Sequence, residues 1–243
     1  MRARYSRNDV FVVADAIADD RFCDNPLVVN DPKIRFYAGC PLRSLEGHKL
    51  GTLCIYDTQP RRFEQKDAEI LRDLALMVER ELAAVRLATV DELTHIPNRR
   101  GFRMLAEQAL RLCARQNMPA SLVFMDLDKF KSINDTYGHA EGDRALRTFA
   151  AQMIATYRES DLFARLGGDE FVALLTDTTQ ALAEALIERL RQSLEQAAEE
   201  AGEGYHVAFS HGVVEYDPAQ HRTIDALLSE GDKLMYTVKK AKR

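Results

Sequence analysis

The acids best placed to do chemistry lie in two short motifs, and the first is the pentapeptide Gly167-Gly168-Asp169-Glu170-Phe171. It stands between two apolar segments typical of strands. Two glycines allow a tight turn with positive φ and let a bulky ligand approach the backbone. Adjacent carboxylates at such a turn repel each other, and a divalent cation is a natural way to offset that repulsion. For this pentapeptide alone, a solvated hairpin turn is an equally good interpretation.

The second motif, Phe124-Met125-Asp126-Leu127-Asp128, ends an apolar strand in acids. A carboxylate at the position of Asp126 is costly to bury without a partner. A strand-end carboxylate that faces an acid pair at a hairpin tip is the arrangement of a two-metal phosphoryl-transfer site. Strands that simply end in acids are common, but the presence of both motifs in one α/β domain favours the metal site.

The elements that must position these acids are helices and strands that alternate over residues 91–243. The apolar run 121–128 predicts a strand near the centre of a sheet. The segments 161–168 and 169–177 flank the two glycines and predict a hairpin. The other expected elements are a strand at 206–216 and helices at 100–116, 140–157, 179–201 and 223–242.

The motifs and their order resemble the GGDEF family of diguanylate cyclases, which join two GTP molecules into cyclic dimeric GMP. The matching pieces are DELTHIPNRRGF (91–102), FMDLDKFKSINDTYGHAEGDRAL (124–146), ARLGGDEFVALL (164–175), SHGV (210–213) and LMYTVKKAKR (234–243). The resemblance implies an α/β (α+β) fold of the nucleotidyl cyclase kind, with a central, mostly antiparallel sheet wrapped by helices.

The resemblance also assigns roles to the acids. It implies that Asp126 and Glu170 bind Mg²⁺ (or Mn²⁺), together with the backbone carbonyl of Leu127. Asp169 matches the residue proposed to assist deprotonation of the attacking 3′-hydroxyl, and it is a further candidate metal ligand. Asp126, Asp169 and Glu170 are thus the expected catalytic residues.

The substrate GTP is expected to contact a second set of residues. Asn134 and Asp143 match the pair that reads the guanine edge. A carboxylate accepts hydrogen bonds from N1–H and N2–H₂ of guanine, whereas adenine offers the wrong pattern. Gly168 lets the nucleotide lie against the hairpin. The residues that match phosphate contacts are the cations Lys131, Lys239 and Arg243 and the backbone amides of Lys129 and Phe130.

Other matches and departures concern structure more than chemistry. The family motif at the start of the domain is expected to have a structural role, closing the start of the domain on its core. The residues that match this motif are Asp91, Leu93, Thr94, Pro97, Asn98 and Arg99. His95 replaces a commoner Gly, and His211 stands where an apolar residue is usual. The final helix carries an unusual Glu230-Gly231-Asp232-Lys233. None of these departures removes an expected metal or guanine contact.

A possible regulatory site is the tetrapeptide Arg158-Glu159-Ser160-Asp161, whose Arg158 lies nine residues before Gly167. Its spacing matches the product-inhibition site of the family, where Arg and Asp clasp an intercalated dimer of cyclic dimeric GMP. An arginine fork binds a guanine edge and a phosphate well. The competing interpretation is a surface Arg–Asp ion pair at a helix end.

The amino-terminal part has a different pattern. Residues 1–63 alternate short apolar runs with turns and resemble the second half of a GAF domain, so we expect a partial sensory domain there. Residues 64–90 have helical periodicity and predict a linking helix. This helix either forms a parallel coiled coil with a second copy or packs as an amphipathic helix on its own domain. The domain carrying the acids is then 91–243.

Composition sets limits on location and partners. The 243 residues carry a formal net charge of −5, so bulk charge recruits neither nucleic acid nor an anionic membrane. There is no apolar run of membrane-spanning length and no signal peptide at the start. The four cysteines show no metal spacing and are expected to be buried, reduced thiols of a cytoplasmic protein.

The leading prediction is therefore an enzyme, a Mg²⁺-dependent diguanylate cyclase that works as a homodimer. Each domain would hold one GTP and half of a reaction centre. Cyclic dimeric GMP would be both product and inhibitor. The alternatives are a non-catalytic receptor for cyclic dimeric GMP or GTP, and an enzyme that makes a mixed GMP–AMP dimer.

Overall fold

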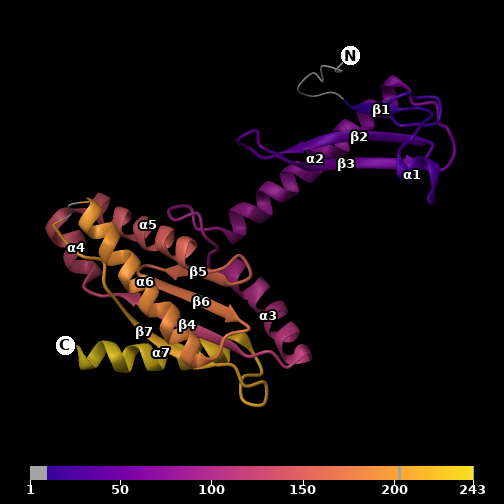
Figure 1. Ribbon diagram of the computed structural model, residues 1–243. Coiled ribbons are helices and arrows are strands. Elements are labelled where there is room, and N and C mark those ends of the chain that lie inside the picture. Colours follow the sequence, from indigo (N-terminus) through magenta and orange to yellow (C-terminus); the bar gives the residue numbers. More distant parts are fainter. Residues whose placement is uncertain (1–9, 202–203, 243) are drawn as a thin grey trace. The chain divides into compact units, whose positions relative to one another are not determined.

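The chain forms two compact units that are joined within one helix (Figure 1). The computed structural model describes residues 10–201 and 204–242. The first unit comprises residues 1–86 and the second residues 87–243. The joining helix α2 spans Gln65–Thr89, in the place where the sequence predicts a linking helix.

The first unit is a three-stranded antiparallel sheet covered by α2. Its strands are β1 (Phe11–Val13), β2 (Phe36–Arg43) and β3 (Lys49–Asp57), and a short helix α1 spans Pro26–Val29. The sheet order is β1-β2-β3. Leu71 and Ala75 of α2 are buried with Phe36 and Ala38 of β2. The first half of α2 therefore packs on its own domain, which confirms the amphipathic alternative for that half.

The second unit contains the elements that the acidic motifs require. Its helices are α3 (Arg99–Gln116), α4 (Phe130–Tyr137), α5 (His139–Thr156), α6 (Gln180–Ala201) and α7 (Ile224–Ala241). Its strands are β4 (Ala120–Leu127), β5 (Leu162–Gly167), β6 (Glu170–Thr176) and β7 (Phe209–Glu215). The short helix α4 is the one element of this unit that the sequence pattern does not predict.

The four strands form one antiparallel sheet in the order β5-β6-β4-β7. β4 lies inside the sheet, as its apolar run predicts, and β5 and β6 form the expected hairpin. Helices lie on both faces (Figure 1). Residues of α5 and α6 form one buried cluster with the sheet, while residues of α3 and α7 form another. The predicted antiparallel sheet wrapped by helices is confirmed.

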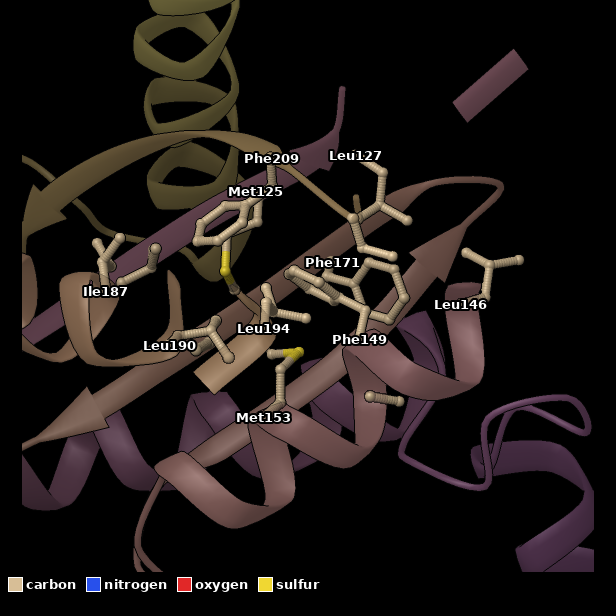
Figure 2. Packing of buried hydrophobic residues seen from close by; sticks show 14 of the residues in the cluster. Met125, Leu127, Leu146, Phe149, Met153, Phe171, Ile187, Leu190, Leu194 and Phe209 are labelled. Carbon is tan, nitrogen blue, oxygen red and sulfur yellow. The ribbon is translucent and has the colours of Figure 1, made fainter. Parts of the chain in front are cut away.

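The core under α5 and α6 is rich in aromatic rings (Figure 2). Phe149 of α5 packs between Phe171 of β6 and Phe209 of β7, with ring centroids 4.6 and 5.3 Å apart. All three side chains are fully buried. Burial of such rings contributes about 2 kcal/mol each. This packing holds in place the strand ends that carry the acids.

Helix α7 packs against β7 with almost no space between the two backbones. A β-carbon on Gly212 would collide with the carbonyl oxygen of Gly231 and the amide nitrogen of Met235. Gly231, one of the unusual residues of the last helix, lies over Leu122 and Phe124 of β4. The close approach carries the last turns of α7 across the end of the sheet where Asp126 lies.

The expectation that the four cysteines are free, buried thiols is only partly met. All four cysteines are free, but only Cys40 and Cys113 are buried, so the expectation of burial is wrong for Cys23 and Cys54. Cys54 is exposed on β3, an edge strand of its sheet. Within the described residues, no helix is both long and apolar enough to cross a bilayer.

Candidate active site

Strand register brings the two acidic motifs together. Asp126 of β4 is directly opposite Glu170 of β6 in the antiparallel ladder. The amide of Leu127 donates to the carbonyl of Asp169 at 3.1 Å, which ties the end of β4 to the hairpin turn. Gly168 has a φ of +54°, the left-handed conformation that the sequence predicts at this turn. The acids therefore share one end of the sheet, on the face covered by α3 and α7.

Each of the two facing carboxylates has a cationic partner from a flanking helix. The ammonium group of Lys239 on α7 contacts Oδ1 of Asp126. The guanidinium of Arg99, at the start of α3, lies 3.6 Å from Oε2 of Glu170. Lys239 is a predicted triphosphate contact, and the structure brings it to the acids. Arg99 has a role at the site that the sequence analysis did not assign to it.

The environment disfavours negative charge on both carboxylates. Burial raises the pKa of Asp126, and the neighbouring Asp169 carboxylate adds to the rise against the pull of Lys239. Burial likewise raises the pKa of Glu170; Arg99 pulls the pKa down, while Asp232 and Asp126 add to the rise. Such carboxylates gain from a nearby cation that neutralises them.

The donor chemistry of this site fits a hard divalent cation. Carboxylate and carbonyl oxygens are what Mg²⁺ and Mn²⁺ prefer. Asp126, Asp169, Glu170 and the carbonyl of Leu127 supply only such oxygens. Within the described residues, no three His, Cys, Asp or Glu side chains gather into a metal-ligand cluster. The facing pair Asp126 and Glu170 is therefore the part of the expected ligand set that the fold brings into register.

A second acid at the end of β4 holds the last turn of α7. Asp128 accepts hydrogen bonds from Ser210 Oγ at 2.6 Å and from Lys242 Nζ at 2.9 Å. Burial opposes ionisation of Asp128, but these two donors outweigh it and lower its pKa. Lys242 also donates to the carbonyl of Phe209 at 3.1 Å. These contacts fix the helix turn that carries Lys239.

The predicted guanine-reading residues lie on two consecutive helices. Asn134 is on α4 and Asp143 is on α5, and both side chains are half-buried. Neither side chain makes a hydrogen bond or an ion pair with another residue in the described part of the chain. Their polar groups are available to a ligand.

The remaining residues that are predicted to contact phosphate lie at the start of α4 and at the end of the chain. Lys129 adopts the left-handed conformation just before α4, and the first amides of a helix, here from Phe130 onwards, have no acceptor within it. Lys131 is exposed on α4, with no ion pair in the described residues. Arg243 lies outside the described residues.

A salt bridge between Asp91 and Arg165 links the start of the second unit to the β5–β6 hairpin. Nη1 of Arg165 lies 3.1 and 3.2 Å from the two oxygens of Asp91, and its Nε donates to the carbonyl of Gly168 at 2.9 Å. Asn98 donates to the carbonyls of Ala88 and Val90. A series of polar contacts thus links the residues at the end of α2 to the hairpin turn at Gly168.

We expect Asp91→Asn to destabilise the second unit by about 1–2 kcal/mol at pH 7, because Arg165 loses a charged, partly buried partner. Burial opposes ionisation of Asp91, but Thr94 and Arg165 outweigh it and lower its pKa below the ordinary 3.8. A carboxylate whose pKa is lowered by folding stabilises the fold fully at pH values above its ordinary pKa. This stabilisation is lost as the pH falls through the lowered pKa of the folded chain.

The check is denaturant unfolding of wild type and Asp91→Asn between pH 7 and pH 3. The difference in unfolding free energy should narrow below about pH 4. Asp73→Asn, at an exposed and unpaired position, is the matched control. A difference that is constant over this range contradicts a role for the ionised carboxylate.

The predicted inhibitory pair has a clear local geometry. Asp161 is only 6% exposed, and its carboxylate accepts the backbone amides of Arg158 at 3.0 Å and Thr176 at 3.3 Å. The side chain of Arg158 is exposed and makes no hydrogen bond or ion pair with other described residues. The surface ion pair that competes with the inhibitory interpretation does not occur among the described residues.

The sequence analysis gave no role to four residues around the site: Arg165, Asp128, Ser210 and Lys242. Strand alternation two residues before the glycines could have flagged Arg165 as a neighbour of the turn. Asp128 and Lys242 are 114 residues apart, and no local pattern links them.

The fold and the site together define a nucleotidyl-cyclase-like domain with facing carboxylates at its sheet end. Residues 88–243 match the family model described as "Diguanylate cyclase, GGDEF domain". The chain belongs to this family. Residues 2–82 match the GAF domain model, a match that extends into α2.

Two curated relatives and one solved structure illustrate the similarity. Probable diguanylate cyclase DgcE of Escherichia coli K12 is 32% identical over 209 residues, covering 85% of this chain and 17% of the relative. Diguanylate cyclase TpbB of Pseudomonas aeruginosa UCBPP-PA14 is 38% identical over 155 residues, or 63% of this chain and 35% of the relative. The chain thus spans only about a sixth to a third of these relatives.

The solved GGDEF domain of TpbB (YfiN) from Pseudomonas aeruginosa PAO1 superposes with a TM-score of 0.57. It is 37% identical, and the match covers 63% of this chain and 89% of that one. This agreement extends over most of a solved structure that comprises only the GGDEF domain of its protein.

Proposed function

We propose that this chain is a diguanylate cyclase that condenses two molecules of GTP into cyclic dimeric GMP and pyrophosphate. The observation that carries the proposal is the register of Asp126 and Glu170 at the end of the sheet. Family membership supports the same reaction, and relatives named as diguanylate cyclases support it further.

In the proposed reaction, the 3′-oxygen of one GTP attacks the α-phosphorus of the other. A P–O bond forms, the bond to the β-phosphate oxygen breaks, and pyrophosphate leaves. Asp169 assists removal of the 3′-hydroxyl proton. Repetition in the opposite direction closes the ring. Two GTP molecules therefore give one cyclic product and two pyrophosphates.

Asp126, Glu170, Asp169 and the Leu127 carbonyl are the proposed ligands of Mg²⁺ or Mn²⁺. When bound, such an ion stabilises charge on the transferring phosphoryl group and lowers the pKa of a bound hydroxyl. Lys239 and Lys131, the amides of Lys129 and Phe130, and Arg243 bind the triphosphate. We further propose that Lys239 exchanges its contact with Asp126 for a phosphate oxygen when nucleotide and metal enter.

The reaction needs two copies of the chain, because each domain holds one GTP and half of the reacting atoms. Exposed apolar side chains along α2 support pairing with a second copy: Leu74, Met77, Leu82 and Val85 are 43–64% exposed. The contacts from Asp91 to Gly168 would then relay the state of α2 to the catalytic turn. The GAF-like unit is the proposed source of that signal.

The experiment is to supply the chain with equal concentrations of GTP and ATP, together with Mg²⁺, and to separate the products. Cyclic dimeric GMP should be the only dinucleotide, because Asp143 and Asn134 select guanine at both half-sites. A mixed GMP–AMP dimer as main product would contradict the proposed base selection.

A further inference from the structure

Gly142, which precedes the proposed guanine contact Asp143, has an unusual neighbour. The amide group of Asn134 occupies the place where a β-carbon would stand on Gly142. A methyl group built there would overlap the side-chain oxygen of Asn134 and lie 2.9 Å from its Cγ. Contact between carbons at that distance is closer than van der Waals packing allows.

The nearest clash is with one flexible side chain. The atoms nearest to the hypothetical methyl group all belong to the amide end of Asn134. No backbone and no other side chain stands among these three nearest atoms. A larger residue at position 142 would therefore push the amide aside and leave the packing of α4 against α5 in place.

The same amide has no other restraint. Asn134 makes no side-chain hydrogen bond with the described residues, so only packing fixes its position. That packing surface is the bare backbone of Gly142, and Asp143 is the next residue on α5. Because Gly142 is buried and lacks a side chain, the amide of one helix packs against the backbone of the next helix, one residue before Asp143.

We infer that Gly142 is a specificity-determining positioning residue, which holds the Asn134 amide beside Asp143 so that both read one guanine edge. The inference rests on the proposed function only in that the ligand is a guanine nucleotide. Gly142 itself touches no ligand and acts through Asn134. A helical glycine is otherwise costly relative to alanine, so its presence here needs such a reason.

The test is a double-mutant cycle on nucleotide binding. The probe is GTP with a methylene group between the α- and β-phosphorus, which cannot release pyrophosphate, in the presence of Mg²⁺. Titration calorimetry on the full chain compares wild type, Gly142→Ala, Asn134→Ala and the double variant, with the matching ATP analogue to measure selectivity. Gly51→Ala, at an exposed position with open space around it, is the control.

We expect Gly142→Ala and Asn134→Ala each to weaken binding of the GTP analogue roughly five- to tenfold, the value of one lost hydrogen bond. Both should lower the preference over the ATP analogue. The double variant should bind as Asn134→Ala does, since Gly142 has nothing left to position. Gly51→Ala should bind as wild type, and the melting temperature of Gly142→Ala should be unchanged or higher.

Three results overturn the inference: unchanged binding by Gly142→Ala, losses that multiply in the double variant, or an unfolded Gly142→Ala. The last would show that the backbone, not Asn134, needs the glycine. Because the readout is binding, the expected cycle supports the inference even if no product forms. Missing product contradicts only the proposed function.

Discussion

Replacing Asp126 by Asn or Glu170 by Gln should reduce formation of cyclic dimeric GMP about a thousandfold while leaving the fold intact. Each change removes a proposed ligand from the metal that stabilises the transferring phosphoryl group, a loss of roughly 4 kcal/mol in the barrier. Initial rates with GTP and Mg²⁺, measured on the purified variants, give the answer directly.

Stability measurements separate this chemical role from a structural one. Burial raises the pKa of both acids, so folding makes the charged form of each less favourable than it is in the unfolded chain. Their charged forms therefore destabilise the fold as the pH rises, and a neutral amide should leave the melting temperature unchanged or higher. Glu188→Gln, an exposed and unpaired residue of α6, should behave as wild type. A folded Glu170→Gln that turns over at the wild-type rate removes Glu170 from the site.

Cyclic dimeric GMP should inhibit the wild-type chain without competing with GTP, and Arg158→Ala should abolish that inhibition. The exposed guanidinium of Arg158 is free to bind a guanine edge and a phosphate. An intercalated product dimer bound there would hold two domains apart in an unproductive orientation. Basal activity should survive because the side chain of Arg158 is exposed and makes no hydrogen bond or ion pair within the described residues.

Arg158→Ala tests the inhibitory site without disturbing the fold, whereas Asp161→Ala would also destabilise the domain. Removing the Asp161 carboxylate leaves the amides of Arg158 and Thr176 unpaired, which costs about 1–3 kcal/mol. Arg147→Ala, at an exposed and unpaired arginine, controls for loss of positive charge. Equal inhibition curves for wild type and Arg158→Ala would exclude this site.

The sequence predicts much of the catalytic unit because its signals are local. The apolar run ending in Asp126 marks a central strand, and the paired glycines mark a hairpin whose tip must carry Asp169 and Glu170. Antiparallel pairing of these strands then brings Asp126 opposite Glu170. Helix α4 is missed because eight mostly polar residues do not form a stable helix alone, and tertiary contacts such as the burial of Ile133 hold it in place.

The contacts that tune the site depend on tertiary packing and could not be predicted. Lys239 reaches Asp126 from 113 residues away because two glycines let α7 lie close to the sheet. The bonds from Arg165 to both Asp91 and Gly168 depend on the shape of two turns. The contact of Asn134 with Gly142 depends on how α4 and α5, which are joined by a short turn, pack against each other. Residue types alone do not encode these distances.

The central claim is that two facing carboxylates and a guanine-reading pair make this chain a diguanylate cyclase. The most direct measurement is a time course of the purified full chain with GTP and Mg²⁺, with nucleotides and pyrophosphate quantified at several chain concentrations. The account predicts two pyrophosphates for each cyclic dimeric GMP, and a rate per chain that rises with concentration as dimers form. GTP that stays intact under these conditions, while the chain binds it or cyclic dimeric GMP, would contradict catalysis and identify a receptor.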